Sequence, residues 1–203
     1  QPISYISLNK RLYNLSFEVI LSKIDITNFE GVYEPAEDSW LIAKHIPEFS
    51  GSVLEVGCGS GIVSLHLAQR GNIVTAIDIN PKAVEATKFN AKNNNLKIEI
   101  LKGNMFSSVQ NRKFGNIVCN PPYLPPSDNY DDPELELAVE GGNKGIEFTK
   151  NLLSEAHHYL ENTGSIYMIQ SSKMGDFETD WKKEIIKEMS FFFEKLYLVR
   201  FFS

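Results

Sequence analysis

The motif Asn120-Pro121-Pro122-Tyr123 is the part of this sequence best suited to chemistry, and it directly follows a predicted β-strand. Two consecutive prolines fix the backbone and remove two N–H donors. The loop therefore offers acceptors, namely the Asn120 side-chain oxygen and the Pro121 carbonyl, while Tyr123 adds an aromatic face. Such a loop can hold an NH₂ group by both hydrogens and present its nitrogen to an electrophile.

The nitrogen of an amide or an aromatic amine is a poor nucleophile because its lone pair is delocalised. Acceptors on both N–H bonds help the nitrogen to pyramidalise and stabilise the positive charge that it gains as a methyl group arrives. Alignment of the nitrogen with the methyl donor supplies the rest of the rate enhancement. No general base is needed before transfer. Cys58, in a predicted turn, and Cys119, in a buried predicted strand, are not placed as nucleophiles.

A glycine-rich turn preceded by an acidic residue is the second candidate site. Glu55 stands before Gly57, Gly59 and Gly61 in the pattern G-x-G-x-G, between a predicted strand and a predicted helix. Glycines let the backbone turn tightly and approach a ligand. The dinucleotide fingerprint is G-x-G-x-x-G, and Glu55 would repel a pyrophosphate but attract an ammonium or sulfonium group. The turn therefore favours S-adenosylmethionine over NAD, with a plain strand–helix connection as the alternative.

Two more polar residues follow predicted strands at the same edge of the sheet. Asp78 ends the second strand, 17 residues after Gly61, where a carboxylate can accept both hydroxyls of a ribose. Its alternative role is a helix N-terminal charge before Pro81. Asn104 follows the third strand, where its side-chain oxygen can accept an adenine amino group, unless it is simply a turn residue.

The elements that must position these residues alternate between strand and helix from residue 51 onward. This alternation predicts an α/β fold, a mostly parallel sheet with helices on both faces. The predicted strands are 52–56, 72–79, 96–101, 116–119 and 165–169, and the predicted helices are 36–46, 62–70, 81–93 and 143–161. Residues 191–202 predict a strand. Residues 182–189 fit either a helix or a strand. We favour a strand that pairs antiparallel with residues 191–202 and buries the aromatic side chains of that segment.

Length and composition limit the classes of protein that fit. The 203 residues suit one full α/β domain. Asp and Glu outnumber Lys and Arg by 26 to 20, which argues against binding nucleic acid chiefly by its phosphates. No apolar run approaches the roughly 20 residues of a membrane span, and no secretory signal is visible. Two cysteines cannot form a disulfide framework and fit a reducing cytoplasm.

These motifs together resemble the HemK-type class I methyltransferases, which methylate the glutamine of the Gly-Gly-Gln motif in translation release factors. The segment 32–39, Val-Tyr-Glu-Pro-Ala-Glu-Asp-Ser, and the segment 140–145, Glu-Gly-Gly-Asn-Lys-Gly, match the short archaeal and eukaryotic branch. The resemblance implies a Rossmann-like seven-stranded sheet with an antiparallel C-terminal strand. It makes residues 31–203 one methyltransferase domain and residues 1–30 a short N-terminal extension, too short for the release-factor-binding helical domain of bacterial members.

The resemblance also implies roles for individual residues. Contacts with S-adenosylmethionine are expected from Tyr33, Pro35, Glu37, Ser39, Glu55, Gly57, Gly59, Gly61, Asp78, Ile79, Asn104, Met105 and Asn120. Asn120, Pro121, Pro122 and Tyr123 are expected to hold the substrate amide, and no metal is expected. The family usually has Asp where this chain has Asn104. Relatives in this branch work with a small, often zinc-containing activator protein, which is expected at the edge formed by the third strand.

Several rival readings stay open from the sequence. The same pocket would take the exocyclic amine of adenine in DNA or RNA, and the side chain of a protein lysine is another possible methyl acceptor. A third alternative is a protein that binds S-adenosylmethionine without catalysis and supports a partner enzyme. His157 and His158 are adjacent in a predicted helix and do not make a metal pair. The acidic stretch from Asp128 to Glu136 is interpreted as a solvated loop that can order over the site.

Overall fold

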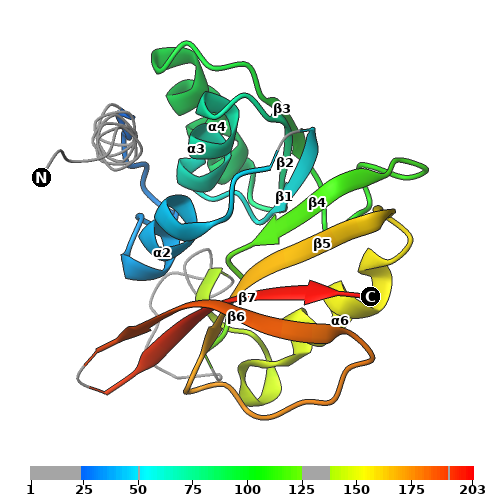
Figure 1. Cartoon of the computed structure of the whole chain (residues 1–203). Coiled ribbons are helices and arrows are strands. Elements are labelled where there is room, and N and C mark those ends of the chain that lie inside the picture. Colours follow the sequence, from blue (N-terminus) through cyan, green and yellow to red (C-terminus); the bar gives the residue numbers. More distant parts are fainter. Residues whose placement is uncertain (1–23, 50, 125–137, 192) are drawn as a thin grey trace, which may run out of the picture.

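The structure, a computed structural model, describes residues 24–49, 51–124, 138–191 and 193–203. The acidic stretch 128–136 and most of the N-terminal extension lie outside these ranges. Among the described residues, none of the helices has the length and apolar character that a bilayer crossing requires. The elements shown in Figure 1 are the strands β1 Ser52–Val56, β2 Ile73–Asp78, β3 Glu99–Lys102, β4 Phe114–Cys119, β5 Leu160–Ser171, β6 Lys182–Ser190 and β7 Lys195–Phe202, the helices α2 Glu37–His45, α3 Ile62–Gln69, α4 Pro81–Asn93 and α6 Glu147–Ala156, and the 3₁₀ turn η1 Asn143–Gly145.

The seven strands form one sheet in the order β3-β2-β1-β4-β5-β7-β6. Strands β1 to β5 pair in parallel, whereas β7 runs antiparallel to β5 and β6 antiparallel to β7. The predicted fold class is therefore confirmed, including the strand preferred for residues 182–189. The strand order reverses between β1 and β4, and open α/β sheets bind ligands at the carboxyl ends of the strands beside such a switch point.

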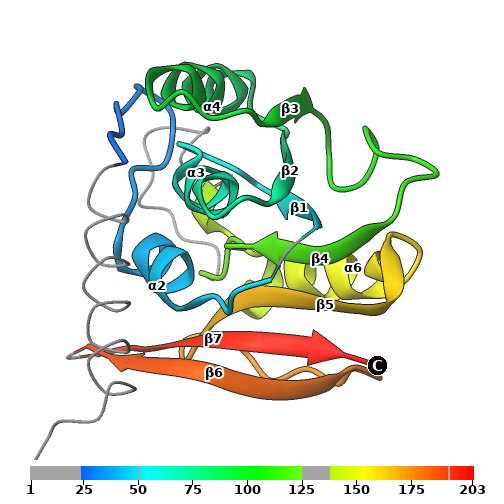
Figure 2. The ribbon, with the colours of Figure 1, turned by 45° about the horizontal axis from the view of Figure 1, so that its top comes forward.

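Helices cover both faces of the sheet, and successive side chains of each strand point alternately into two hydrophobic cores. Val53 of β1 packs with α2 and α3, whereas the next residue, Leu54, packs with α6 on the other face. The same alternation separates Val118 from Ile117 in β4, as expected for strands whose successive side chains point to opposite faces. Figure 2 shows the strands in succession from β3 to β6. This packing fixes the positions of the loops that leave the carboxyl ends of β1 and β4.

The third strand is shorter than predicted. It begins at Glu99 instead of residue 96, because the end of α4 continues into a closed turn. There the N–H of Leu96 donates to the carbonyl of Ala91 at 2.9 Å, and Asn95 takes a left-handed φ of 55°. Such a cap satisfies helix carbonyls that otherwise have no partner. The predicted position of this strand at a sheet edge is confirmed.

The predicted helix 143–161 was wrong at both ends. The α-helix spans Glu147–Ala156, and the chain then turns so that the carbonyl of Tyr159 accepts from the N–H of Phe114 at 2.8 Å. This pairing with β4 starts β5 at Leu160, before the predicted 165. The last strand begins at Lys195 and not at the predicted 191, since the N–H of Phe191 donates to the carbonyl of Glu194 at 2.7 Å before the strand starts. The other predicted boundaries agree with the structure or differ from it by at most two residues.

Candidate active site at the carboxyl ends of β1 and β4

A cavity of about 340 Å³ lies at the switch point of the sheet. Its wall joins the start of α2, the glycine-rich turn after β1, the end of β2 and the loops after β3 and β4. The predicted site residues that line it are Tyr33, Ser39, Glu55, Gly57, Gly59, Asp78, Ile79, Asn104, Met105, Asn120, Pro121, Pro122 and Tyr123. The structure thus brings together motifs that are up to 90 residues apart in the chain, from Tyr33 to Tyr123.

Three predicted cofactor contacts lie outside the lining of the cavity. Glu37, the first residue of α2, is exposed, and Pro35, in the segment that leads into α2, is partly buried. Gly61 is buried, and a Cβ there would lie 2.8 Å from Cγ2 of Thr87 on α4. Gly61 therefore allows α3 and α4 to pack closely. For these three residues the cofactor role stays a prediction.

The glycine-rich turn folds back over the end of β2. The backbone N–H groups of Gly57 and Cys58 both donate to the carbonyl of Ile77, at 2.8 and 3.1 Å. The N–H of Gly59 donates to Oδ2 of Asp78 at 2.9 Å, and the N–H of Asn80 donates to Oδ1 at 2.9 Å. Burial raises the pKa of this carboxyl. Asp78 is therefore held at the cavity wall by the turn itself.

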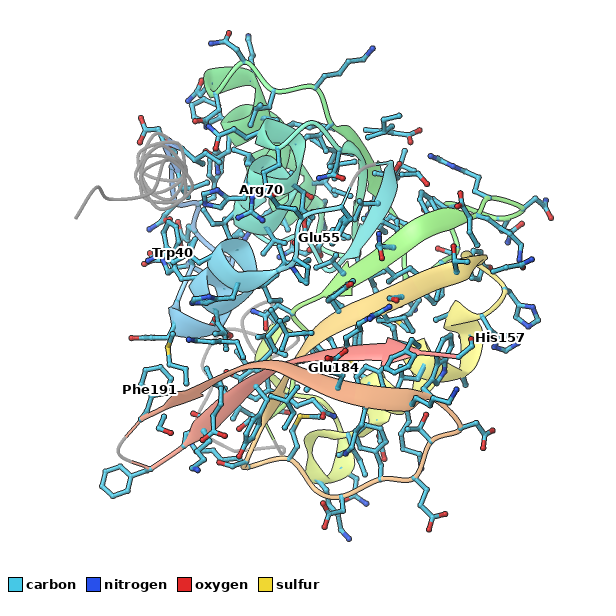
Figure 3. All side chains as sticks on the ribbon, in the orientation of Figure 1. Trp40, Glu55, Arg70, His157, Glu184 and Phe191 are labelled. Atoms are coloured by element: carbon cyan, nitrogen blue, oxygen red, sulfur yellow. The ribbon has the colours of Figure 1, made fainter. Side chains whose placement is uncertain are left out.

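Glu55 is a buried acid at the centre of the fold and lines the cavity (Figure 3). Its side chain is 2% exposed, and the Ser64 hydroxyl donates a short hydrogen bond to Oε2. Burial is the main reason that its pKa rises to about 8, and the hydrogen bonds from Ser64 oppose this rise. A buried carboxyl of this kind is stabilised in its ionised form by a nearby cation. Glu55 thus fits the recognition of a positively charged ligand group.

Asn120 places a buried acceptor without a partner beside the cavity. Its Nδ2 donates to Oγ of Ser39 over 3.5 Å, whereas its Oδ1 is buried and has no hydrogen-bond partner among the described residues. An unpaired buried acceptor costs about 1–3 kcal/mol. Native proteins keep few such groups, and those that they keep call for an explanation. A bound N–H donor would satisfy this oxygen.

Asp38 is a residue of this site for which the sequence motifs predicted no role. It lies in the first turn of α2, is 4% exposed, and accepts at Oδ2 from the hydroxyls of Tyr33 and Tyr123, at 3.2 and 3.3 Å. Burial and this carboxylate raise the pKa of both tyrosines. No spacing in the sequence could show this, because Tyr123 lies 85 residues from Asp38.

The glycine-rich segment 140–145 lies directly against the Asn-Pro-Pro-Tyr loop. The N–H of Gly141 donates to the carbonyl of Leu124 at 2.9 Å, and a Cβ on Gly141 would lie 2.4 Å from the carbonyl oxygen of Pro122. The contact between Leu124 and Glu140 is an isolated parallel β-bridge. The segment therefore supports the loop from one side, with glycine where the backbones approach.

Other titratable groups lie away from this chemistry. Burial raises the pKa of the Cys58 and Cys119 thiols well above the usual value, so neither is a ready nucleophile. His157 and His158 follow the end of α6 in a turn, not in the predicted helix, and Figure 3 shows His157 at the surface, far from Glu55. In the ranges that the structure covers, no His, Cys, Asp and Glu residues group as metal ligands.

Comparison with known proteins adds to this geometry. The sequence model described as the methyltransferase small domain matches residues 24–134. The chain is 38% identical to a Methanocaldococcus jannaschii protein provisionally named protein N5-glutamine methyltransferase, over 83% of this chain and 90% of that protein. It is 34% identical to the release factor glutamine methyltransferase of Streptococcus pneumoniae, over 66% of this chain but only 51% of that relative. A methyltransferase from Pyrococcus furiosus shares the fold, with a TM-score of 0.63 at 18% identity over 95% of this chain and 98% of that one.

Proposed function

Because the chain belongs to the methyltransferase small domain family, and within it to the protein N5-glutamine methyltransferases, we propose that it methylates the side-chain amide nitrogen of a protein glutamine. S-adenosylmethionine is the proposed methyl donor. The Gly-Gly-Gln motif of a translation release factor is the proposed acceptor, since the Streptococcus relative is named for that class of substrate. The observation that carries the proposal is the buried, partnerless Oδ1 of Asn120 beside the cavity.

The residues at the cavity fit the proposed donor. The carboxyl of Glu55 suits the positively charged part of S-adenosylmethionine, and the carboxyl of Asp78 suits its ribose hydroxyls. Ile79 is 44% exposed although it is apolar, so it offers a surface for the adenine ring beside Asn104 and Met105. An exposed apolar side chain in a cavity is a common feature of ligand sites.

The protein's part in the reaction is to orient and stabilise. S-adenosylmethionine, when bound, supplies an electrophilic methyl group. The side-chain oxygen of Asn120 and the carbonyl of Pro121 each accept a hydrogen bond from the NH₂ group of the substrate amide. These two contacts align the nitrogen and stabilise the positive charge that develops on it. With the donor bound, its S–C bond would break as the N–C bond to the substrate forms. The amide proton then leaves to solvent, so the site needs no general base.

One labelling experiment tests this function. The purified chain is incubated with methyl-labelled S-adenosylmethionine and a release factor, its Gly-Gly-Gln→Gly-Gly-Ala variant, a lysine-rich protein, or adenine-containing DNA and RNA. Label on the release factor that is lost in the variant supports the proposal. Label on lysine or on adenine would replace it with one of those acceptors. Binding of S-adenosylmethionine without transfer to any acceptor would indicate a non-catalytic subunit.

We further propose that a small, zinc-containing activator protein docks on the β3 edge and that the complex works in a reducing cytoplasm, as the resemblance to the short branch suggests. The N–H of Gly103 donates to the carbonyl of Asp78 on β2 at 2.9 Å. By the alternation of a strand, the N–H groups of Ile100 and Lys102 point away from β2. Such an edge is a template for strand addition. The free, buried thiols of Cys58 and Cys119 fit a reducing compartment.

A further inference from the structure

We propose that Asp38 is a positioning residue for methyl transfer: acting through Ser39, it fixes the orientation of the Asn120 amide so that Oδ1, and not the NH₂ group, faces the substrate. This inference rests on the proposed function, because it concerns how the site presents an acceptor to an amide. It assigns a role to a residue that the sequence motifs left without one.

The side-chain amide of Asn120 can take either of two orientations. The two ends of an asparagine amide have nearly the same shape, but one accepts hydrogen bonds and the other donates them. With Oδ1 toward the substrate, Asn120 accepts one of the substrate's N–H bonds. If the amide flipped, the NH₂ group of Asn120 would face the NH₂ group of the substrate. The positive charge that develops on the substrate nitrogen would then lie beside a hydrogen-bond donor. Shape alone cannot prevent this flip.

The hydrogen bonds around Asp38 decide the orientation. Oδ1 of Asp38 accepts from the N–H of Ser39 at 2.6 Å and from the Ser39 hydroxyl at 3.2 Å. A carboxylate only accepts hydrogen bonds, so the single proton of the Ser39 hydroxyl is directed to Asp38. Oγ of Ser39 can then only accept from Asn120. The NH₂ group of Asn120 therefore takes the side of Ser39, 3.5 Å away, and Oδ1 takes the other side.

The second oxygen of Asp38 holds the other end of the same loop. Oδ2 accepts from the Tyr123 hydroxyl at 3.3 Å, as well as from Tyr33. Asp38 and Ser39 are both buried at the start of α2, which packs into the core through Leu41 and Ile42. One carboxylate on a fixed helix thus orients both the first and the last residue of the Asn-Pro-Pro-Tyr motif. Four hydrogen-bond donors satisfy this carboxylate: the hydroxyls of Tyr33 and Tyr123, and the N–H and hydroxyl of Ser39.

A double-mutant cycle tests whether Asp38 acts through Asn120. In Asp38→Ala, the Ser39 hydroxyl loses the carboxylate that accepts its proton, so it is free to donate to Asn120 and Asn120 can flip. We expect kcat on the release factor to fall about 10- to 100-fold, with the dissociation constant of S-adenosylmethionine changed less than threefold. Adding Asp38→Ala to Asn120→Ala should lower kcat much less than Asp38→Ala does in the wild type, because only the contact with Tyr123 is left to lose. Fully additive losses would overturn the proposal.

Conservative variants guard against a misfolded mutant. Ser39→Ala removes the acceptor for Asn120 and should lower kcat, whereas Ser39→Thr keeps the hydroxyl and should restore most of it. Equal losses in these two variants would overturn the relay. Glu155→Ala, which also truncates an acidic side chain but at an exposed position on α6, is the matched control for Asp38→Ala and should leave kcat unchanged.

An activity-independent readout separates this inference from the proposed function. In the free protein, nuclear Overhauser effects should connect the Asn120 side-chain NH₂ protons with the Ser39 Hβ protons, and Asp38→Ala should weaken them. If they persist unchanged in Asp38→Ala, the relay is wrong even when glutamine is methylated. If the wild-type chain labels no glutamine, the proposed function fails, while the same spectra still decide the orientation of Asn120.

Discussion

A Cβ atom on Gly145 would lie 2.1 Å from the carbonyl oxygen of Tyr123. Gly145 also has a φ of +67°, in the left-handed region. The glycine-rich segment and the Asn-Pro-Pro-Tyr loop are thus in backbone contact at this point. A side chain on Gly145 must displace the last residue of the loop, which connects the support of the loop to its chemistry.

Gly145→Ala should destabilise the chain and reduce methyl transfer. The left-handed φ costs about 1–2 kcal/mol for alanine, and the overlap with Tyr123 adds about 1–3 kcal/mol. Gly71→Ala is a matched control, since Gly71 has a φ of +88° but open space around its Cβ position, so it should show only the first cost. Urea unfolding curves measure both losses. Equal losses in the two variants would contradict the contact.

Asp78→Ala should weaken binding of S-adenosylmethionine by roughly 1.5–3 kcal/mol, about 10- to 150-fold in the dissociation constant. The loss combines the proposed ribose contacts with the hydrogen bonds to the N–H groups of Gly59 and Asn80. Isothermal titration calorimetry measures it. Asp78→Asn keeps one acceptor oxygen and should lose less. Unchanged affinity in a folded Asp78→Ala variant would remove Asp78 from the site.

Asn120→Ala should lower the methyl-transfer rate by about 10²–10³, as the loss of one preorganised charge-stabilising group commonly does. The affinity for S-adenosylmethionine should fall less than the rate. Single-turnover assays with the release factor separate these effects. Asn151→Ala, an exposed exchange on α6, is the control. Near-normal turnover by Asn120→Ala would exclude the mechanism.

Glu55 should make the unfolding free energy fall as the pH rises. Its pKa is about 8 in the folded chain and near 4.5 when unfolded, with burial as the chief cause. Between these values the folded state binds a proton that the unfolded state has released, so stability decreases by up to about 1.4 kcal/mol per pH unit. The unfolding free energy of Glu55→Gln should therefore rise relative to that of the wild type between pH 5.5 and 7.5, whereas that of Glu155→Gln should not. Parallel unfolding profiles for wild type and Glu55→Gln would show that burial does not hold this proton.

Ile100→Pro should prevent docking of the proposed partner. Proline removes an N–H that points away from β2 and stiffens an edge strand without removing a bond of the sheet. Ile98, which the predicted strand included, lies before β3 and is the matched control position. Co-purification from the native cell measures docking. A monomer that is fully active on the release factor without another protein would contradict the proposal.

Local chemistry in the sequence was sufficient for several elements. Helix α4 spans Pro81–Asn93 as predicted, because Asn80 caps it by accepting from the N–H of Lys82 at 2.9 Å and proline stands at its first position. These groups are neighbours in the chain, so their types and order decide the outcome. The glycine-rich turn follows the same logic in part, since Gly57, Gly59 and Gly61 supply the positive φ values that its tight backbone needs.

Only the tertiary structure decided which distant groups meet. Asp38 joins Tyr33 with Tyr123, Gly145 meets Tyr123, and β5 begins early because Tyr159 pairs with Phe114. None of these contacts leaves a periodicity or a spacing, because each depends on how β1, β4 and α2 are packed. The sequence by itself determined which residues could hold a cofactor and an amide. Sheet order and helix packing determined which buried carboxylate orients them, since a hydrogen bond depends on distance in space and not along the chain.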